Sequence, residues 1–372
     1  MKICILLRSF ERGGAEHQAS ITAAELRRRG HDVAVVVFRQ APAYAEVLDA
    51  AGIAPHVLAG SQIGLLVRFR SWVEEHQPDV IMSYLAGPNL LAATARLIRN
   101  RPSVVWGVRS TSLRLGDETR LGRAVYRLEP MLSRWCDAAI ANSYAARLDA
   151  RERGFNVDQF DVVPNGVDTD RWRPSDETRG ALRARHGLPI DGFVIGRIGR
   201  VHPMKDLSTL FRSVARLNGD PRVIIAVVGG GNVEYVEKMR REASSLGVAG
   251  DVVWVGERSD LDSVYPAMDV VVSSSAYGEG FPNVIGEALS SGVPCIGTDV
   301  GDTASLIGDE RFVVGPGNDV ALSAAIRAMF EIGEEARRVL GQAGRDRIVE
   351  TYSVPALGDQ LEAVLSTVTR RR

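Results

Sequence analysis

Two carboxylates, Glu279 and Glu287, flank the start of a predicted helix that directly follows an apolar run, residues 268–273. That run is too short for a helix and predicts a buried strand. Pro282 suits the first turn of the helix, where its missing N–H is not needed. A helix N-terminus offers unpaired N–H groups and a partial positive charge, which favour phosphate or another anion. The stretch therefore predicts an anion site beside two carboxylates, which on this evidence alone could act as an acid/base pair.

Two cations lie five residues apart on another strand-to-helix turn. Arg200 and Lys205 follow the predicted strand 192–198, and lysine is rare in this chain. A guanidinium fork and a point charge hold phosphate oxygens in complementary ways. The turn is therefore predicted to bind a diphosphate, while His202 between the two cations is interpreted as a loop residue.

Glycines mark two further turns after predicted strands. Gly13 and Gly14 open a helix after the first strand, and Gly229, Gly230 and Gly231 follow the strand 222–228. Glycine lets the backbone come close to a ligand, although it also occurs in ordinary turns. The pattern Gly-x-Gly-x-x-Gly is missing, which counts against an ordinary dinucleotide-binding domain.

The composition is typical of a soluble globular protein of two domains: 372 residues, 45% hydrophobic and 24% charged. A formal net charge of −1 gives no bulk attraction to nucleic acid, and no long apolar run predicts a membrane span. Arg8 interrupts the N-terminal apolar run, which predicts a strand, not a secretory signal, so a cytoplasmic protein is expected. The three cysteines are far apart and the histidines are scattered, so no metal site is predicted. Motifs of serine hydrolases, P-loop proteins and zinc proteases are absent from the sequence.

Short β-branched runs alternate with longer helical segments, which is typical of parallel sheets covered by helices. A short strand at 161–163 runs into the turn Pro164-Asn165-Gly166, which predicts a domain boundary. We expect two doubly wound α/β domains, residues 1–168 and 169–352, and a last helix in 353–372 that packs back on the first domain. The other predicted strands are 2–7, 32–38, 79–83, 103–107 and 138–141 in the first domain, and 192–198, 222–228, 251–254, 267–272 and 294–298 in the second.

In this order and at these intervals, the motifs resemble the retaining glycosyltransferases of family 4, which have the GT-B fold of two Rossmann-like domains with a cleft between them. The resemblance runs through most of the chain. The residues that carry it are Gly13-Gly14-Ala15-Glu16, Val163-Pro164-Asn165-Gly166-Val167-Asp168, Arg200 with Lys205, the glycines from Gly229, and Glu279-Gly280-Phe281-Pro282-Asn283 ending at Glu287.

The resemblance implies a role for each part of a donor site held mainly by the second domain. Arg200 and Lys205 would bind the diphosphate and stabilise it as the leaving group, without a metal ion. Glu279 would hold hydroxyls of the donor sugar, and Glu287 those of the ribose. Eight residues of helix would separate these carboxylates by about 12 Å, which suits two ends of one donor better than a shared proton. The implied site further contains Gly13, Gly14, Gly229, Gly230, Arg258 beside the base, and the stretch Gly280, Phe281, Pro282, Asn283 and Val284.

The implied reaction transfers a hexose or N-acetylhexosamine from a nucleotide-diphosphate donor, expected to be a UDP-sugar, to a saccharide, lipid-linked or small-molecule acceptor. In the family the acceptor hydroxyl attacks from the front face and gives its proton to the departing phosphate. No cofactor besides this co-substrate is expected. The expected partners are the donor and the acceptor, with no nucleic acid.

One position departs from the family. Several members carry a histidine near the donor sugar after the strand 103–107, whereas this chain has Val108-Arg109-Ser110-Thr111. Arg109 is accordingly a candidate catalytic residue that would contact sugar, acceptor or phosphate. A structural ion pair is an equally good interpretation of this arginine.

The acceptor side is less defined. The stretch 113–127 is rich in arginine, which suits a lipid-linked acceptor and peripheral contact with the inner face of a membrane, or only a solvated surface. Two other functions stay open at this point. A sugar-nucleotide epimerase of the same architecture would convert the donor without an acceptor, and a non-catalytic subunit would only bind it.

Overall fold

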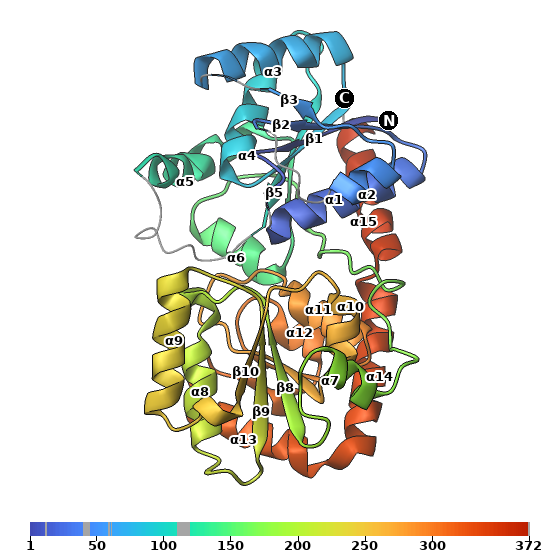
Figure 1. The fold of residues 1–372 in the computed structure, drawn as a ribbon. Helices are drawn as coiled ribbons and strands as arrows, with labels where there is room; N and C mark the ends of the chain where they lie inside the picture. Colours follow the sequence, from blue (N-terminus) through green and yellow to red (C-terminus); the bar gives the residue numbers. More distant parts are fainter. Residues whose placement is uncertain (12, 40–44, 59, 61, 110–119, 371–372) are drawn as a thin grey trace. The chain divides into compact units, whose positions relative to one another are not determined.

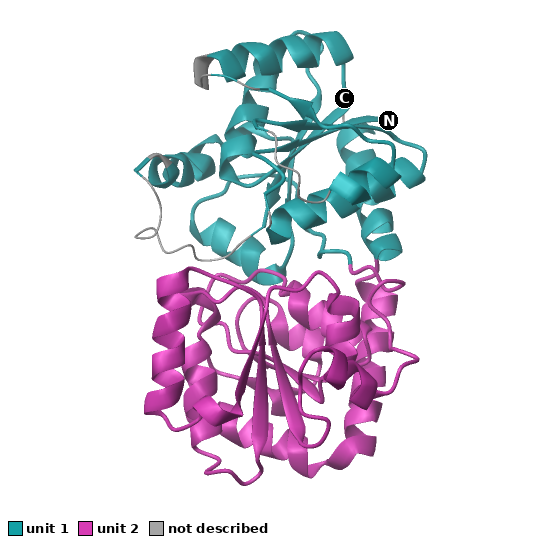
Figure 2. Cartoon of the chain, in the orientation of Figure 1, with its two compact units in different colours: residues 1–166, 354–372 teal, residues 167–353 magenta. Residues whose placement is uncertain are grey.

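The computed structural model describes residues 1–11, 13–39, 45–58, 60, 62–109 and 120–370 (Figure 1). The chain forms two compact units, unit 1 of residues 1–166 and 354–372 and unit 2 of residues 167–353 (Figure 2). It changes unit after Gly166 and after Ser353, whereas the predicted boundaries lie after 168 and 352. Each unit has its own parallel sheet, and each is described by itself.

The described part of unit 1 contains a seven-stranded parallel sheet of strand order β3-β2-β1-β4-β5-β6-β7. Most strand residues are buried, because helices cover both faces and apolar β-branched side chains fill them. The strands are β1 (Lys2–Leu7), β2 (Asp32–Val37), β3 (His56–Val57), β4 (Val80–Tyr84), β5 (Ser103–Val108), β6 (Ala138–Ala141) and β7 (Phe160–Val162). The helices are α1 (Gly14–Arg28), α2 (Ala45–Ala50), α3 (Gln62–His76), α4 (Ala86–Ala93), α5 (Arg120–Leu132), α6 (Tyr144–Glu152) and α15 (Val354–Arg370).

Helix α15 comes from the far end of the sequence and packs against α1 of unit 1. Its apolar face places Leu357, Leu361 and Leu365 in the same core as the inner strands. Arg29, which ends α1, donates hydrogen bonds to Asp359 and Glu362 of α15 at 2.7 Å each. The helix is therefore joined to unit 1 by both apolar and ionic contacts.

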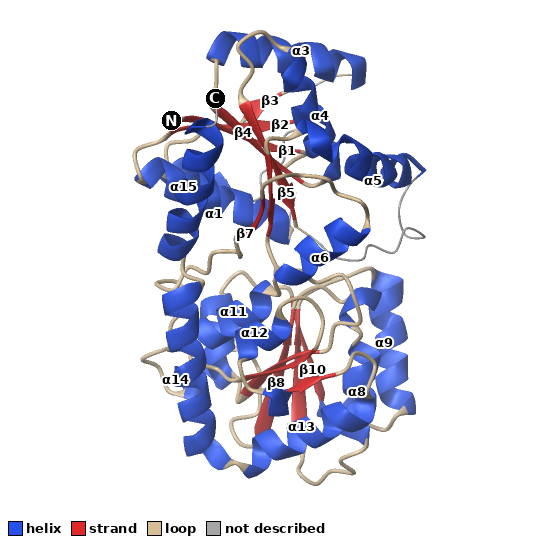
Figure 3. Cartoon of the chain, turned by 180° about the vertical axis from the view of Figure 1, so that it is seen from behind, coloured by secondary structure: helices blue, strands red, loops and turns tan. Residues whose placement is uncertain are grey.

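Unit 2 contains a six-stranded parallel sheet of strand order β10-β9-β8-β11-β12-β13 among its described residues. Figure 3 shows this sheet between two helical layers, α8 and α9 on one side and α11, α12 and α14 on the other. The strands are β8 (Phe193–Ile198), β9 (Val223–Val228), β10 (Val252–Gly256), β11 (Val270–Ser273), β12 (Cys295–Thr298) and β13 (Val313–Val314). The helices are α7 (Arg179–Arg185), α8 (Leu207–Ala215), α9 (Val233–Ser245), α10 (Leu261–Val264), α11 (Asn283–Ser290), α12 (Thr303–Ile307), α13 (Asp319–Glu331) and α14 (Gly333–Thr351).

The α/β prediction is confirmed, and every predicted strand is present. Strands β3 and β13 were not predicted, because two residues are too few to show a periodic pattern. The predicted helix after Pro282 is α11, with Pro282 at its N-cap. Among the described residues, no helix combines the length and apolar character that crossing a bilayer requires.

Candidate active site

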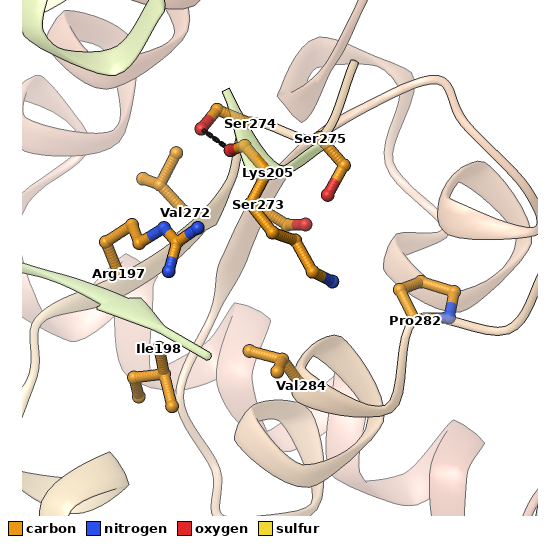
Figure 4. A pocket seen from close by; sticks show the side chains of 9 residues that line it. All are labelled: Arg197, Ile198, Lys205, Val272, Ser273, Ser274, Ser275, Pro282 and Val284. Carbon is orange, nitrogen blue, oxygen red and sulfur yellow. Dashed lines mark hydrogen bonds between the residues drawn. The ribbon is translucent and has the colours of Figure 1, made fainter. Parts of the chain in front are cut away.

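Most of the predicted donor residues of unit 2 follow β8 or β11, which are neighbours in the sheet. The connection from β8 runs to one side and that of β11 to the other, and ligands of open parallel sheets bind at such a switch point. A small pocket opens there (Figure 4). It is lined by Arg197, Ile198, Lys205, Val272, Ser273, Ser274, Ser275, Pro282 and Val284.

Lys205 and Glu279 form an ion pair at this pocket, between Nζ and Oε1. The side chains are only 18% and 10% exposed. Ser275 also donates a 2.7 Å hydrogen bond to Oε1 of Glu279. Two predicted catalytic residues, one following β8 and the other β11, are thus in direct contact, and the pair balances their charges within the pocket.

Hydrogen bonds from neighbouring strand ends hold the Lys205 turn in place. Ser274 donates to the backbone oxygens of Lys205 and Asp206, each at 3.0 Å. Figure 4 shows the bond to Lys205. Asp206 has a left-handed conformation, φ 40°, and its carboxylate caps α8 by accepting from the N–H of Thr209 at 3.1 Å. Lys205 therefore projects from a turn whose backbone is fixed on both sides.

Arg197 is a second cation that lines the pocket, and it was not among the predicted site residues. Its guanidinium lies almost fully buried within β8 and donates to the backbone oxygens of Gly199 at 2.7 Å and Arg200 at 2.9 Å. Burial lowers its pKa to about 10, against the opposing effect of the Glu279 charge, so it stays protonated at neutral pH. An arginine inside an otherwise apolar strand was the sequence signal that could have identified it.

The Arg200 side chain is exposed, in contrast to Arg197 and Lys205. It forms no ion pair with the described residues. The loop that carries it approaches α11, where a Cβ on Gly199 would lie 3.9 Å from Val284. Arg200 therefore offers an exposed guanidinium on the loop between β8 and Lys205.

The glycines after β9 shape the Arg200 loop. A Cβ on Gly229, where φ is +131°, would lie 2.3 Å from the backbone oxygen of Gly199, and one on Gly231 would lie 2.2 Å from that of Val201. The N–H of Val201 donates to the oxygen of Gly230 at 2.7 Å. The close approach predicted for these glycines is thus an approach to the backbone of the cation loop.

Glu287 lies within α11, and its carboxylate has a different partner from that of Glu279. Tyr265, which is fully buried, donates a 2.6 Å hydrogen bond to its Oε2. Burial raises the pKa of Glu287 to about 7, while the Tyr265 bond and the charge of Arg171 lower it. The two glutamates share no partner among these contacts, which argues against an acid/base pair. No sequence pattern pointed to Tyr265.

The remaining predicted residues of unit 2 have varied environments. The Phe281 side chain is buried against Tyr352, with ring centroids 5.6 Å apart, so only its backbone can face a ligand. The Gly280 oxygen accepts from the N–H of Asp302 at 2.9 Å. Asn283 begins α11. Arg258 follows β10 and pairs with Asp260 at 2.5 Å, so a bound base would have to share this cation.

Three predicted residues belong to unit 1. Gly13 is the N-cap of α1 and Gly14 its first residue, so both lie at a helix N-terminus after β1. Arg109 directly follows β5 and is buried, and its guanidinium stacks over Tyr84, 4.4 Å from the ring centroid. The predicted ion pair of Arg109 finds no carboxylate among the described residues. Ser110, Thr111 and the part of the arginine-rich stretch at 113–119 lie outside the described residues.

Within the described ranges, no three His, Cys, Asp or Glu side chains come together as metal ligands would. The three cysteines are unpaired and buried.

Comparison with known proteins connects this geometry to a family. The model of Glycosyltransferase Family 4 matches residues 12–171, and that of Glycosyl transferases group 1 matches residues 178–347. The D-inositol 3-phosphate glycosyltransferase of Mycobacterium leprae is 36% identical over 148 residues, 38% of this chain and 33% of that protein. The protein of that name from Mycobacterium tuberculosis is 34% identical over 150 residues, 40% of this chain and 31% of the relative. The chain thus matches about a third of the length of these relatives.

Solved structures share the fold over the whole chain. HepE from Anabaena in complex with UDP has a TM-score of 0.87 at 24% identity, covering 99% of this chain and 100% of that one. Sucrose-phosphate synthase from Thermosynechococcus elongatus has a TM-score of 0.83 at 18% identity, covering 100% of both chains. These likenesses show the GT-B fold. With both family models matched in chain order, the protein belongs to glycosyltransferase family 4, the glycosyl transferases of group 1, and is a glycosyltransferase.

Proposed function

We propose that the enzyme transfers a hexose or an N-acetylhexosamine from a UDP-sugar to an acceptor hydroxyl, with retention of configuration. The observation that carries the proposal is the contact of Lys205 with Glu279 near the buried Arg197, with the exposed Arg200 on the same loop as Lys205. This set has a net charge of about +2, which suits a diphosphate. The HepE complexes with UDP and with UDP-glucose support the choice of nucleotide.

Each residue has a stated task in the proposed mechanism. Arg200 and Lys205 bind the two phosphates and stabilise the negative charge that develops on the leaving group. When the donor enters, Lys205 exchanges its contact with Glu279 for phosphate oxygens. Glu279 then accepts hydrogen bonds from hydroxyls of the sugar, and Glu287 from those of the ribose.

The bond changes balance without a protein base. The bond between the anomeric carbon and the terminal phosphate oxygen breaks, and the acceptor oxygen bonds to that carbon from the same face. The acceptor proton moves to the departing phosphate. The positive charge around the pocket favours this step because the leaving oxygen gains negative charge as the bond lengthens.

The acceptor in this proposal is a saccharide, a lipid-linked saccharide or a small molecule. The curated relatives are named for a small phosphorylated acceptor. Contact with a lipid surface is supported by α5, where the exposed Leu128 and Met131 lie beside the exposed Arg127. Sedimentation with anionic vesicles tests this part, and protein that stays in the supernatant contradicts it.

Protection by UDP against thermal unfolding tests the donor site. UDP at about 100 times its dissociation constant should stabilise the protein by about 2.7 kcal/mol. Arg200→Ala and Lys205→Ala should each abolish most of this protection. Arg222→Ala is the matched control, because the exposed Arg222 lies in unit 2 before β9 and pairs with the half-buried Asp251. An absence of protection by any nucleoside diphosphate would contradict the proposed function.

A further inference from the structure

Arg109 is a buried cation without a carboxylate partner. The residue is 8% exposed, and both Nε and Nη2 of its guanidinium lack a hydrogen-bond acceptor. Nη1 makes one long bond, 3.4 Å, to Oδ1 of Asn165. The stacking on Tyr84 is the other contact that its guanidinium makes among the described residues.

The other buried arginines of the described chain are satisfied. Arg183 pairs with Asp269 at 2.5 Å, and its remaining nitrogens donate to backbone oxygens, including that of Ala267 at 2.9 Å. Arg197 uses both Nη atoms on backbone oxygens of its own loop. A buried charge that lacks its partner is strongly destabilising, so the free donors of Arg109 require a group that the described residues do not supply.

Arg109 also lies at the carboxyl-end edge of its sheet, where ligands of open parallel sheets bind. It follows the carboxyl end of β5, next to Tyr84 at the end of β4. Leu85, the next residue, has φ 71° and ψ 164°, a conformation that is rare for any residue except glycine. Strained backbone of this kind clusters at ligand sites.

A second polar group with an unmet hydrogen bond lies in the same place. Asn142, after β6, donates to the backbone oxygen of Arg109 at 3.4 Å, and its own Oδ1 has no donor. The edge therefore offers free donors on a cation and one free acceptor. An anionic group and a hydroxyl on one ligand would satisfy both kinds of atom.

We propose that Arg109 binds a phosphate or carboxylate group carried by a substrate, so that the enzyme selects a polyol or sugar bearing such a group besides the diphosphate. This inference rests on the proposed function. The charged group can belong to the acceptor or to the transferred sugar, and both sources present the same chemistry to Arg109. A guanidinium with two free donors suits the two oxygens of either group.

Inorganic phosphate tests the site without knowledge of the substrate. The protein is first saturated with UDP, so that the cations of unit 2 are occupied, and phosphate is then added at constant ionic strength. We expect a saturable rise in the melting temperature of about 2 °C or more for the wild type. Arg109→Gln should show no rise. Arg101→Gln is the control and should respond as the wild type does, because Arg101 lies before β5 and already pairs with Asp137 at 3.1 Å.

The phosphate experiment can support or overturn the role of Arg109. A wild type that does not respond to phosphate, or an Arg109→Gln protein that responds equally, overturns the inference. UDP should protect the wild type and Arg109→Gln against thermal unfolding to the same degree. A failure of the proposed donor site would appear as missing protection by UDP, and is therefore distinguished from a failure of the Arg109 site. If Arg109→Gln does not fold, the site is tested instead by soaking crystals of the wild type with selenate and UDP. Selenate within hydrogen-bond distance of Nε or Nη2 supports the site, and selenate bound only elsewhere overturns it.

Paired substrates then identify the source of the charge. Transfer is compared between UDP-glucuronate and UDP-glucose as donors, and between inositol 3-phosphate and inositol as acceptors. Arg109→Gln should lower kcat/KM about 100-fold for the charged member of one pair. Its neutral counterpart should change less than about threefold. An equal loss on charged and neutral members would overturn the inference, because Arg109 would then not select for the charged group.

Discussion

Tyr265 holds one oxygen of Glu287 and leaves the other available. The hydrogen bond to Oε2 is 2.6 Å long, and the tyrosine ring that provides it packs edge-on against Trp172, with centroids 5.6 Å apart. Oε1 has no hydrogen-bond partner among the described residues. A carboxylate fixed in this way can present Oε1 to a ligand without first becoming ordered, which reduces the entropy lost on binding.

The affinity for UDP should therefore rise with pH through about 7, near the raised pKa of Glu287. Ionised Glu287 accepts hydrogen bonds from the ribose more strongly than the protonated acid does. Tyr265→Phe removes a bond that favours the ionised form, so the midpoint should move to higher pH. Calorimetric titration of UDP at a series of pH values gives both midpoints.

The comparison between the two proteins corrects for UDP itself, whose terminal phosphate also titrates near neutral pH. Besides the Tyr265 hydrogen bond, the charge of Arg171 also lowers the pKa of Glu287. Among the described residues, no other charged side chain shifts this pKa. The Tyr265→Phe variant lacks only the tyrosine hydroxyl and keeps Arg171, so a difference in midpoint between the two proteins reports the effect of that hydroxyl. A midpoint that is equal or lower in Tyr265→Phe would show that the hydroxyl does not tune this carboxylate.

Glu279→Gln should leave the protein folded and able to bind UDP while transfer falls about 100-fold or more. The glutamine keeps the size of the side chain and can accept from Ser275, but it cannot balance Lys205 or hold sugar hydroxyls with a full charge. The melting temperature with and without UDP, measured together with the rate of transfer, separates the two effects. Near-normal turnover would place the sugar site elsewhere.

Sequence patterns located the predicted site because parallel strands bring their carboxyl ends to one edge. Lys205 and Glu279 lie far apart in sequence, yet each follows a strand, and β8 and β11 pair side by side. The alternation of strands and helices predicts that both residues lie at this edge, whereas their direct contact depends on the strand order and the side-chain packing that the structure shows. The same logic placed Arg109 and Gly13 at the corresponding edge of the first sheet.

Other features depend on partners that no local pattern reveals. Tyr265 lies in a short connection before β11, and only packing brings it to Glu287. Gly229 was expected to approach a ligand, but the atom that a Cβ at this position would meet is the backbone oxygen of Gly199. Sequence shows that glycine permits a close approach, whereas the pairing of β8 with β9 decides which group approaches.

Gly229→Ala should damage the donor site through the backbone. The new Cβ would lie 2.3 Å from the Gly199 oxygen, so the Arg200 loop must move. Gly192→Ala is a matched control, since Gly192 also has a positive φ but no atom within 4 Å of the added carbon. Both variants should lose about 1 kcal/mol or more of stability from backbone strain. Only Gly229→Ala should also lower the affinity for UDP, by about tenfold or more. Equal affinities for UDP in the two variants would contradict the role of this contact.

Arg29 should be the residue through which α15 is most strongly joined to unit 1. Its guanidinium contacts Glu25 of α1 and both Asp359 and Glu362 of α15, each at 2.7 Å, and Glu25 is itself buried. Arg29→Ala leaves Glu25 with Arg28 alone and should cost about 2 kcal/mol in the free energy of unfolding, measured with urea. Arg70→Ala removes an exposed pair with Glu74 on α3 and should cost almost nothing. If both variants unfold at the same urea concentration, the apolar face of α15 holds the helix and the ionic contacts add little.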